Sequence, residues 1–146
     1  MKFTWTSFKK AVAVKTVGRV LQVDLPLLGI EAITAKVDTG AFSGALHAGR
    51  IREIADSQGV KHLRFSPLGS TGHTIEMDNY HKRRVKSSNG LAASRYAIDT
   101  KVTIQERAYP ITLTLTNRSP MKHQMLIGRN FLRSHGFLVD VNRRNK

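Results

Sequence analysis

Hydrophobic residues recur at every second position over several stretches of this chain. The clearest stretch carries Tyr109, Ile111, Leu113 and Leu115 on one face, with threonines between them. A period of two residues is typical of a β-strand with one buried face. The pattern predicts long strands over residues 12–25, 30–37, 96–104 and 109–115, and short strands over 61–65, 73–77, 125–127 and 137–139.

The segments between these strands complete the expected fold. Residues 106–108 join two alternating stretches and predict a hairpin. Residues 128–134 form the one expected helix, one or two turns long, with Phe131 and Leu132 facing inward. Residues 66–94 are less regular and predict loops and long hairpins, with a type I′ turn at Asn89-Gly90. Many short strands and one short helix near the C-terminus indicate an all-β protein. We expect a single domain over 1–146, with flexible or interface-forming ends.

Composition and charge restrict the function. Lys and Arg total 24 against 10 Asp and Glu, a formal net charge of +14, which attracts polyanions. The chain has no cysteine, which excludes disulfides, a cysteine nucleophile and thiolate metal sites. Residues 1–10 are interrupted by lysines and resemble no secretory signal, and no apolar run is long enough to span a bilayer. We therefore expect a cytoplasmic protein without a membrane partner.

Asp38-Thr39-Gly40-Ala41 is the strongest candidate for chemistry, because it directly follows the predicted strand 30–37. Pepsin-like enzymes present a catalytic carboxylate in this way, at the tip of a strand and before a small hydroxyl residue and a glycine. Aspartic peptidases need two carboxylates that share one proton. The motif occurs once, so two copies of the chain have to meet, and we expect a homodimer.

A second element far downstream supports this interpretation. Ile127-Gly128-Arg129 ends a short apolar strand. In pepsin-like folds such an element packs beside the catalytic loop, where glycine is used because a side chain would collide with the strand that carries the aspartate.

These two elements resemble the retropepsins, the homodimeric aspartic peptidases of retroviral type. A closer resemblance is to the RimK-associated retropepsin-like aspartic peptidase family, the RimB group, often labelled ATP-dependent zinc protease. Seven segments carry it in order, at 23–30, 36–41, 45–48, 84–90, 113–118, 125–129 and 136–140.

The resemblance implies a retropepsin-like closed β-barrel with the active site on a two-fold axis. Asp38 from each copy would flank one water, one carboxylate acting as general base and the other polarising the scissile carbonyl. Thr39 would hydrogen-bond across the axis, and Gly40 would allow substrate and the partner backbone to approach. The expected supporting or substrate-binding residues are Ala41, Lys86, Ser87, Ser88, Asn89, Ile127, Gly128 and Arg129.

Lys86-Ser87-Ser88-Asn89 has two interpretations. Hydroxyl and amide groups beside a cation suit carboxylate binding at a loop tip, and the same residues also suit a simple hairpin turn. No His-Glu-x-x-His motif and no phosphate-binding glycine loop is present, and the six histidines are dispersed. We therefore expect no metal site and no cofactor, despite the zinc and ATP in the family label.

The expected function is a homodimeric aspartic endopeptidase acting on acidic or glutamate-extended protein tails. The net charge favours such a substrate, and so does the family's association with a glutamate ligase. Two alternatives stay open. Phe42, where the bacterial group usually has an arginine, is compatible with a non-catalytic peptide-binding module of the same fold. Charge alone suggests a nucleic-acid-binding protein, which is the less favoured alternative because no nucleic-acid-binding motif is present.

Overall fold

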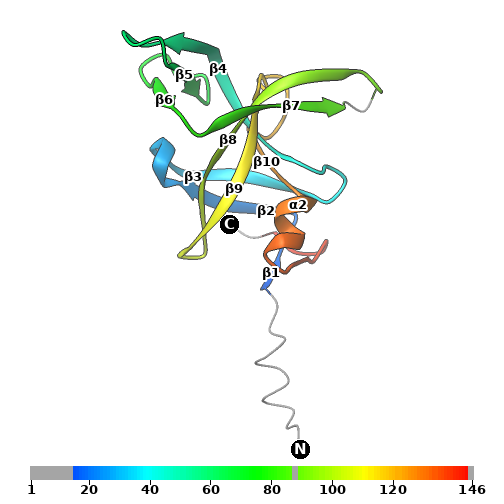
Figure 1. The fold of residues 1–146 in the computed structure, drawn as a ribbon. Helices are drawn as coiled ribbons and strands as arrows, with labels where there is room; N and C mark the ends of the chain where they lie inside the picture. Colours follow the sequence, from blue (N-terminus) through cyan, green and yellow to red (C-terminus); the bar gives the residue numbers. More distant parts are fainter. Residues whose placement is uncertain (1–14, 87–88, 145–146) are drawn as a thin grey trace, which may run out of the picture.

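The computed structural model describes residues 15–86 and 89–144, and strands dominate it (Figure 1). No helix in these two ranges is long and apolar enough to cross a membrane. In chain order the elements are β1 (Lys15–Val17), β2 (Val20–Leu25), the 3₁₀ turn η1 (Pro26–Leu28), β3 (Ile30–Asp38), β4 (Gly44–Ala55), β5 (Lys61–Pro67), β6 (Ile75–Met77), β7 (Tyr80–Lys86), β8 (Ala92–Ile104), β9 (Arg107–Thr116), β10 (Met125–Gly128), α2 (Arg129–Ser134) and β11 (Phe137–Val139). The predicted all-β class and the single short α-helix near the C-terminus are confirmed for these residues.

The strand pairings close into a ring. β10 pairs with β3, β3 with β2, β2 with β8, β8 with β9, β9 with β4, and β4 returns to β10. The β8–β9 pair is the predicted hairpin around residues 106–108. Because β10 lies between β3 and β4, it connects the segment that leads into Asp38 with the segment that follows it.

The core fills the inside of this ring and explains the period-two pattern. The alternate positions that the sequence predicts to be buried are buried on β3 and β9, among them Ile33, Val37 and Leu113. Phe65 and Ile98 are fully buried on β5 and β8. Burial of such side chains contributes roughly 1.5–3 kcal/mol each, so the ring is held mainly by apolar packing rather than by its exposed charges.

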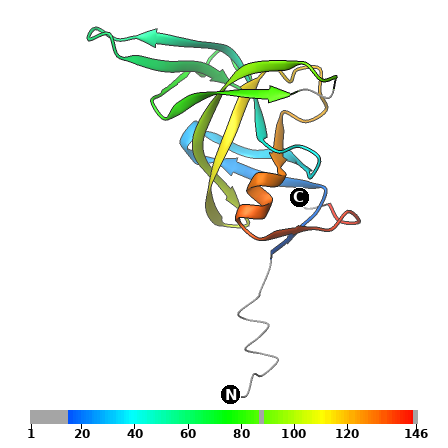
Figure 2. The ribbon, with the colours of Figure 1, turned by 45° about the vertical axis from the view of Figure 1, so that its right-hand side comes forward.

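Two features extend from the ring in opposite directions (Figures 1 and 2). The outer half of β4 pairs with β5, and β5 with β6, to form an arm. β7 and β8 form a second hairpin that ends near Lys86. Glu53 of the arm accepts hydrogen bonds from the hydroxyls of Tyr80 (2.9 Å) and Tyr96 (2.8 Å), which links the arm to the base of this hairpin.

The structure differs from the sequence prediction in several places. The predicted strand over 12–25 is interrupted at Gly18 and Arg19, between β1 and β2, where the Arg19 N–H donates to the Arg143 carbonyl (2.7 Å); residues 12–14 lie outside the described ranges. β4 was not predicted as a strand. Within residues 66–94, β6 lies in a predicted short strand, and β7 with the start of β8 forms a long hairpin of the kind predicted, although β7 itself was not delimited. β7 escaped detection because most of its side chains are charged or exposed, which hides the alternation.

Candidate functional site

The loop that follows β3, residues 38–43, holds the candidate carboxylate and is called the Asp38 loop below. The Asp38 carboxylate accepts a hydrogen bond from the Gly40 N–H (3.0 Å), and its backbone carbonyl accepts one from the Ala41 N–H (3.3 Å). Both bonds fix a tight turn at the end of the strand. The side chain of Asp38 is 29% exposed, with Lys36 Nζ 4.0 Å away, so the carboxylate remains accessible.

Backbone contacts from β10 and the start of α2 hold the Asp38 loop in place. Gly128 is the parallel partner of Asp38. The N–H groups of Arg129 and Asn130 donate to the carbonyls of Ala41 (2.7 Å) and Phe42 (3.1 Å). A side chain at Gly128 would lie 2.6 Å from the Phe42 carbonyl oxygen. The predicted need for glycine is therefore physical, although the group it would meet belongs to the loop after Asp38 rather than to the strand.

The Arg129 side chain also contacts the Asp38 loop. Its Nη1 donates to the Gly40 carbonyl (3.1 Å), and its guanidinium carbon lies 5.4 Å from the centre of the Phe42 ring. Phe42 is 52% exposed, so about half of its surface stays in contact with solvent despite this neighbour.

A cavity of about 470 Å³ opens beside the Asp38 loop and is called the cationic pocket below. Gly40 to Ser43 form one wall, and residues of β7, β8 and the segment after β9 form the others. No acidic side chain of the described residues lines it. Its charged lining residues are Arg83, Arg84, Lys86, Arg95, Arg118 and Arg129.

Arg118 differs from the other cations of this pocket because it is buried, at 9% exposure. Its Nε donates to the His123 carbonyl (3.1 Å), and its backbone N–H donates to His47 Nδ1 (2.9 Å). Burial lowers the pKa of Arg118, the neighbouring Arg95 lowers this pKa further, and the Asp38 carboxylate opposes both effects.

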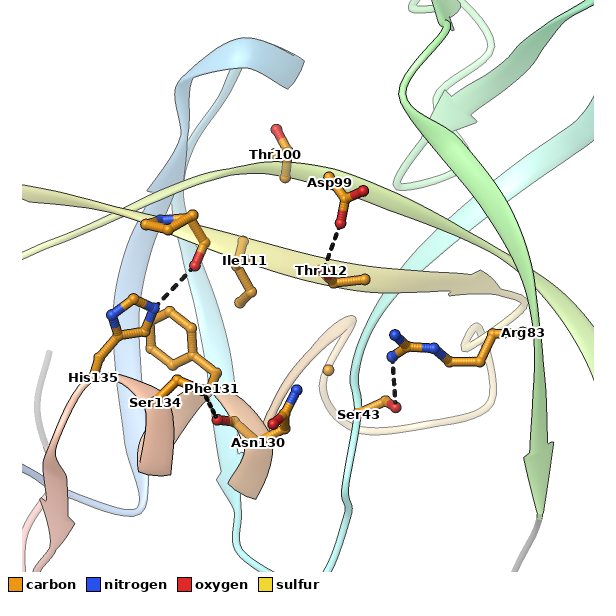
Figure 3. A pocket seen from close by; sticks show the side chains of 12 residues that line it. Ser43, Arg83, Asp99, Thr100, Ile111, Thr112, Asn130, Phe131, Ser134 and His135 are labelled. Carbon is orange, nitrogen blue, oxygen red and sulfur yellow. Dashed lines mark hydrogen bonds between the residues drawn. The ribbon is translucent and has the colours of Figure 1, made fainter.

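A second cavity, of about 440 Å³, lies on the other side of Ser43 and Arg83, which line both cavities. Figure 3 shows the Arg83 guanidinium donating to the Ser43 hydroxyl (3.2 Å). It also shows the Asp99 carboxylate accepting from the Thr112 hydroxyl (2.5 Å). This cavity contains an acid, whereas the cationic pocket does not.

The structure brings most of the predicted site residues together, but not all. Asp38, Gly40 and Ala41 meet Gly128 and Arg129 around one loop. Of the others, Ile127 is buried in β10, Thr39 is exposed, Lys86 lines the far wall of the cationic pocket, and Asn89 is exposed in the turn beyond it. Ser87 and Ser88 lie outside the described residues.

Arg118 was not among the predicted site residues. The signal present was an arginine two residues after the threonine-rich stretch of 112–116, at the end of the segment 113–118 that resembles the family. That signal does not reveal burial, which depends on His47 and His123 from other parts of the chain.

The donor groups do not match the zinc in the family label. Within residues 15–86 and 89–144, no group of three or more His, Asp or Glu side chains is placed to hold a metal ion. These residues therefore do not fit a zinc centre.

Comparison with known proteins assigns the family. Residues 16–145 match the RimB-like family, described as retropepsin-like aspartic endopeptidase RimB, and the chain belongs to this family. The predicted family is thus confirmed.

Named relatives and a solved structure agree with this assignment. Probable alpha-L-glutamate ligases of Shewanella pealeana and Parasynechococcus marenigrum are 37% and 36% identical over 120 and 110 residues. These matches cover 79% and 72% of this chain, but only 26% and 23% of the relatives, so the chain spans about a quarter of their length. A crystal structure of a Legionella pneumophila protein of unknown function is 25% identical, with a TM-score of 0.71 over 90% of this chain and 97% of the other.

Proposed function

We propose that the protein is a homodimeric aspartic endopeptidase that hydrolyses acidic peptides. The observation that carries this proposal is the cationic pocket, because it starts at Gly40 and Ala41, directly beside the candidate carboxylate of Asp38. A peptide bound in the pocket would present its backbone to the Asp38 loop.

The reaction follows from two Asp38 carboxylates that meet at a two-fold axis. The ionised one accepts a proton from a water, whose oxygen attacks the carbonyl carbon of the scissile bond. The protonated one donates to the carbonyl oxygen. The carbon–nitrogen bond then breaks as a proton passes to the leaving amine, which gives one carboxylate and one amine product. Thr39, at the exposed tip of the Asp38 loop, would bond to its counterpart and hold the two loops together.

The substrate class follows from charge. Among the residues that the structure describes, six cationic side chains and no acid line the cationic pocket. Side-chain carboxylates pair well with arginine, whose planar fork binds both oxygens. The relatives named probable alpha-L-glutamate ligase fit the same chemistry, since a ligase of glutamate and a peptidase for glutamate chains handle the same acidic residue. We propose glutamate-rich chains or tails as substrates.

Exposed apolar side chains support a dimer. Phe42 on the Asp38 loop is 52% exposed, and Leu91, directly before β8, is 70% exposed. The described part of β11 pairs with β1 alone, and Leu138 on it is 55% exposed. Open strand edges and exposed apolar side chains are common in interfaces between copies of a chain.

Asp38→Asn tests the chemistry. The amide oxygen still accepts the Gly40 N–H bond, so we expect the loop and the fold to be retained. Because the variant cannot act as general base, cleavage of a glutamate-rich peptide should fall by about 10³-fold or more. Circular dichroism checks the fold, and sedimentation checks for a dimer. Cleavage by Asp38→Asn at the wild-type rate would refute the mechanism, and peptide binding without any cleavage by the wild-type protein would favour a non-catalytic binding module.

A further inference from the structure

We propose that Arg118 is the residue that selects an acidic side chain: its guanidinium binds one substrate carboxylate inside the cationic pocket, next to Asp38. This inference rests on the proposed function and names the side chain that sets its specificity.

Burial distinguishes Arg118 from the remaining cations of the pocket. Arg84, Lys86 and Arg129 are exposed and Arg95 is half-buried, so water already solvates their charges. Arg118 as a whole residue is 9% exposed. A charge at an exposed position adds little to selective binding. A charge that is largely removed from water interacts more strongly with an oppositely charged group, so replacing that group by a neutral one costs more binding free energy.

No acid in the described residues bonds to Arg118. The hydrogen bonds of its guanidinium use Nε alone, toward the carbonyl of His123. Asp38 acts on it electrostatically without forming an ion pair. The two terminal nitrogens of Arg118 have no partner among the described residues, yet they are not sealed from solvent, because the Thr100 hydroxyl is the one described side-chain group that is both buried and unpartnered. These nitrogens are therefore open to a charged partner from the pocket, and the neighbouring cation Arg95 adds to the attraction for an anion. A bound carboxylate would supply the missing partner.

The position of Arg118 is fixed before any ligand arrives. Its backbone N–H donates to His47 Nδ1, and His47 is itself buried, with Nε2 packed against Gly69. Since Nε is also held, the two terminal nitrogens present a fixed pair of donors. Little conformational entropy is lost when such a group binds a carboxylate, which favours affinity as well as selectivity.

Arg118 lines the same cavity as Gly40 and Ala41, which directly follow Asp38, so a carboxylate bound to it would lie close to the scissile bond. The proposal therefore predicts specificity at one substrate position near the cleaved bond, and not a general preference for negative charge along the peptide. The exposed cations of the pocket would supply that general attraction.

The test measures binding on the Asp38→Asn background, so that no turnover is needed. The probes are a fluorescent hexaglutamate peptide and six versions, each with glutamine at one position. With Arg118 present, one glutamine position should weaken binding by about 10- to 100-fold, as expected for loss of a charged hydrogen bond. With Arg118→Gln, that same position should become nearly neutral, while the others keep their small effects.

Two further variants separate selectivity from folding and from overall charge. Arg118→Lys retains the cation, and we expect it to retain the selective position with weaker binding. Arg107→Gln removes one exposed positive charge at the β8–β9 turn and should leave the selective position unchanged. Thermal unfolding accompanies each variant.

If Arg118→Gln weakens binding of all seven peptides equally, or if no position is selective, the assignment to Arg118 is overturned. Cleavage of hexaglutamate by the protein with Asp38 intact is followed separately. Selective binding without cleavage would refute the proposed peptidase activity and leave the role of Arg118 standing.

Discussion

Gly128→Ala is the most direct test of how the Asp38 loop is held. Gly128 has φ −89° and ψ 172°, a conformation that any residue adopts, so backbone strain plays no part. The effect is purely steric. The added methyl carbon would lie 2.6 Å from the Phe42 carbonyl oxygen and 2.7 Å from the Ser43 carbonyl carbon.

The magnitude follows from those distances. A carbon and an oxygen in close contact lie about 3.3 Å apart, so the loop has to move by about 0.7 Å. The Phe42 carbonyl that must move also accepts the Asn130 N–H bond. Overpacking of this kind costs about 1–3 kcal/mol, which lowers the melting temperature by about 2–12 °C for a chain of this size. A shift approaching 1 Å at a catalytic group can reduce the rate about 10²-fold.

Gly72→Ala is the matched control, because the structure places no atom within 4 Å of the added carbon. We expect its stability to change by less than about 0.5 kcal/mol. Thermal unfolding by circular dichroism and cleavage of a glutamate-rich peptide are the two measurements. If Gly128→Ala melts and cleaves like Gly72→Ala, then β10 does not determine the position of the Asp38 loop and the steric reasoning is wrong.

Two other predictions concern the arm. The carboxylates of Asp56 and Asp78 both bond to the His62 ring and raise the pKa of His62 from 6.5 to about 9. Because the pKa of His62 is higher in the folded state than in the unfolded state, the stabilisation by its two ion pairs is complete below pH about 6.5 and is lost as the pH rises through 9. An NMR titration of the His62 ring should show the raised pKa. If the pKa of His62 is unchanged in Asp78→Asn, the assignment of the shift to these contacts is contradicted. The hydrogen bond from Tyr96 to Glu53, followed by burial, raises the pKa of Tyr96. Glu53→Gln should lower that pKa in an ultraviolet titration of the phenols, and no change would show that the hydrogen bond is not maintained in solution.

The sequence predicted the parts of the site that depend on local pattern. The alternation of 30–37 places Asp38 at the end of a strand, and an apolar strand ending in glycine is enough to suggest that Gly128 lies against it. Both patterns can be recognised in a single sequence because each involves only a few consecutive residues.

The cationic pocket could not be predicted in the same way. Arg83 and Arg95 are brought together by the register of β7 and β8, and Arg118 joins them only when His47, 71 residues earlier, accepts its backbone N–H. Net charge indicated an anionic partner without locating it. Burial of a charged residue depends on all of its neighbours, so the sequence alone did not single out Arg118.

Because β10 comes late in the chain, the Asp38 loop is synthesised well before the residues that hold it in place. Arg129 follows the Gly40 carbonyl that it holds by 89 residues. At about 5–20 residues per second, a ribosome needs about 4–18 s to add that length. During this interval Asp38 has been made, but the N–H groups that support its loop have not. A nascent chain therefore cannot hold the carboxylate in its final geometry, and any hydrolytic activity is withheld until synthesis has passed β10.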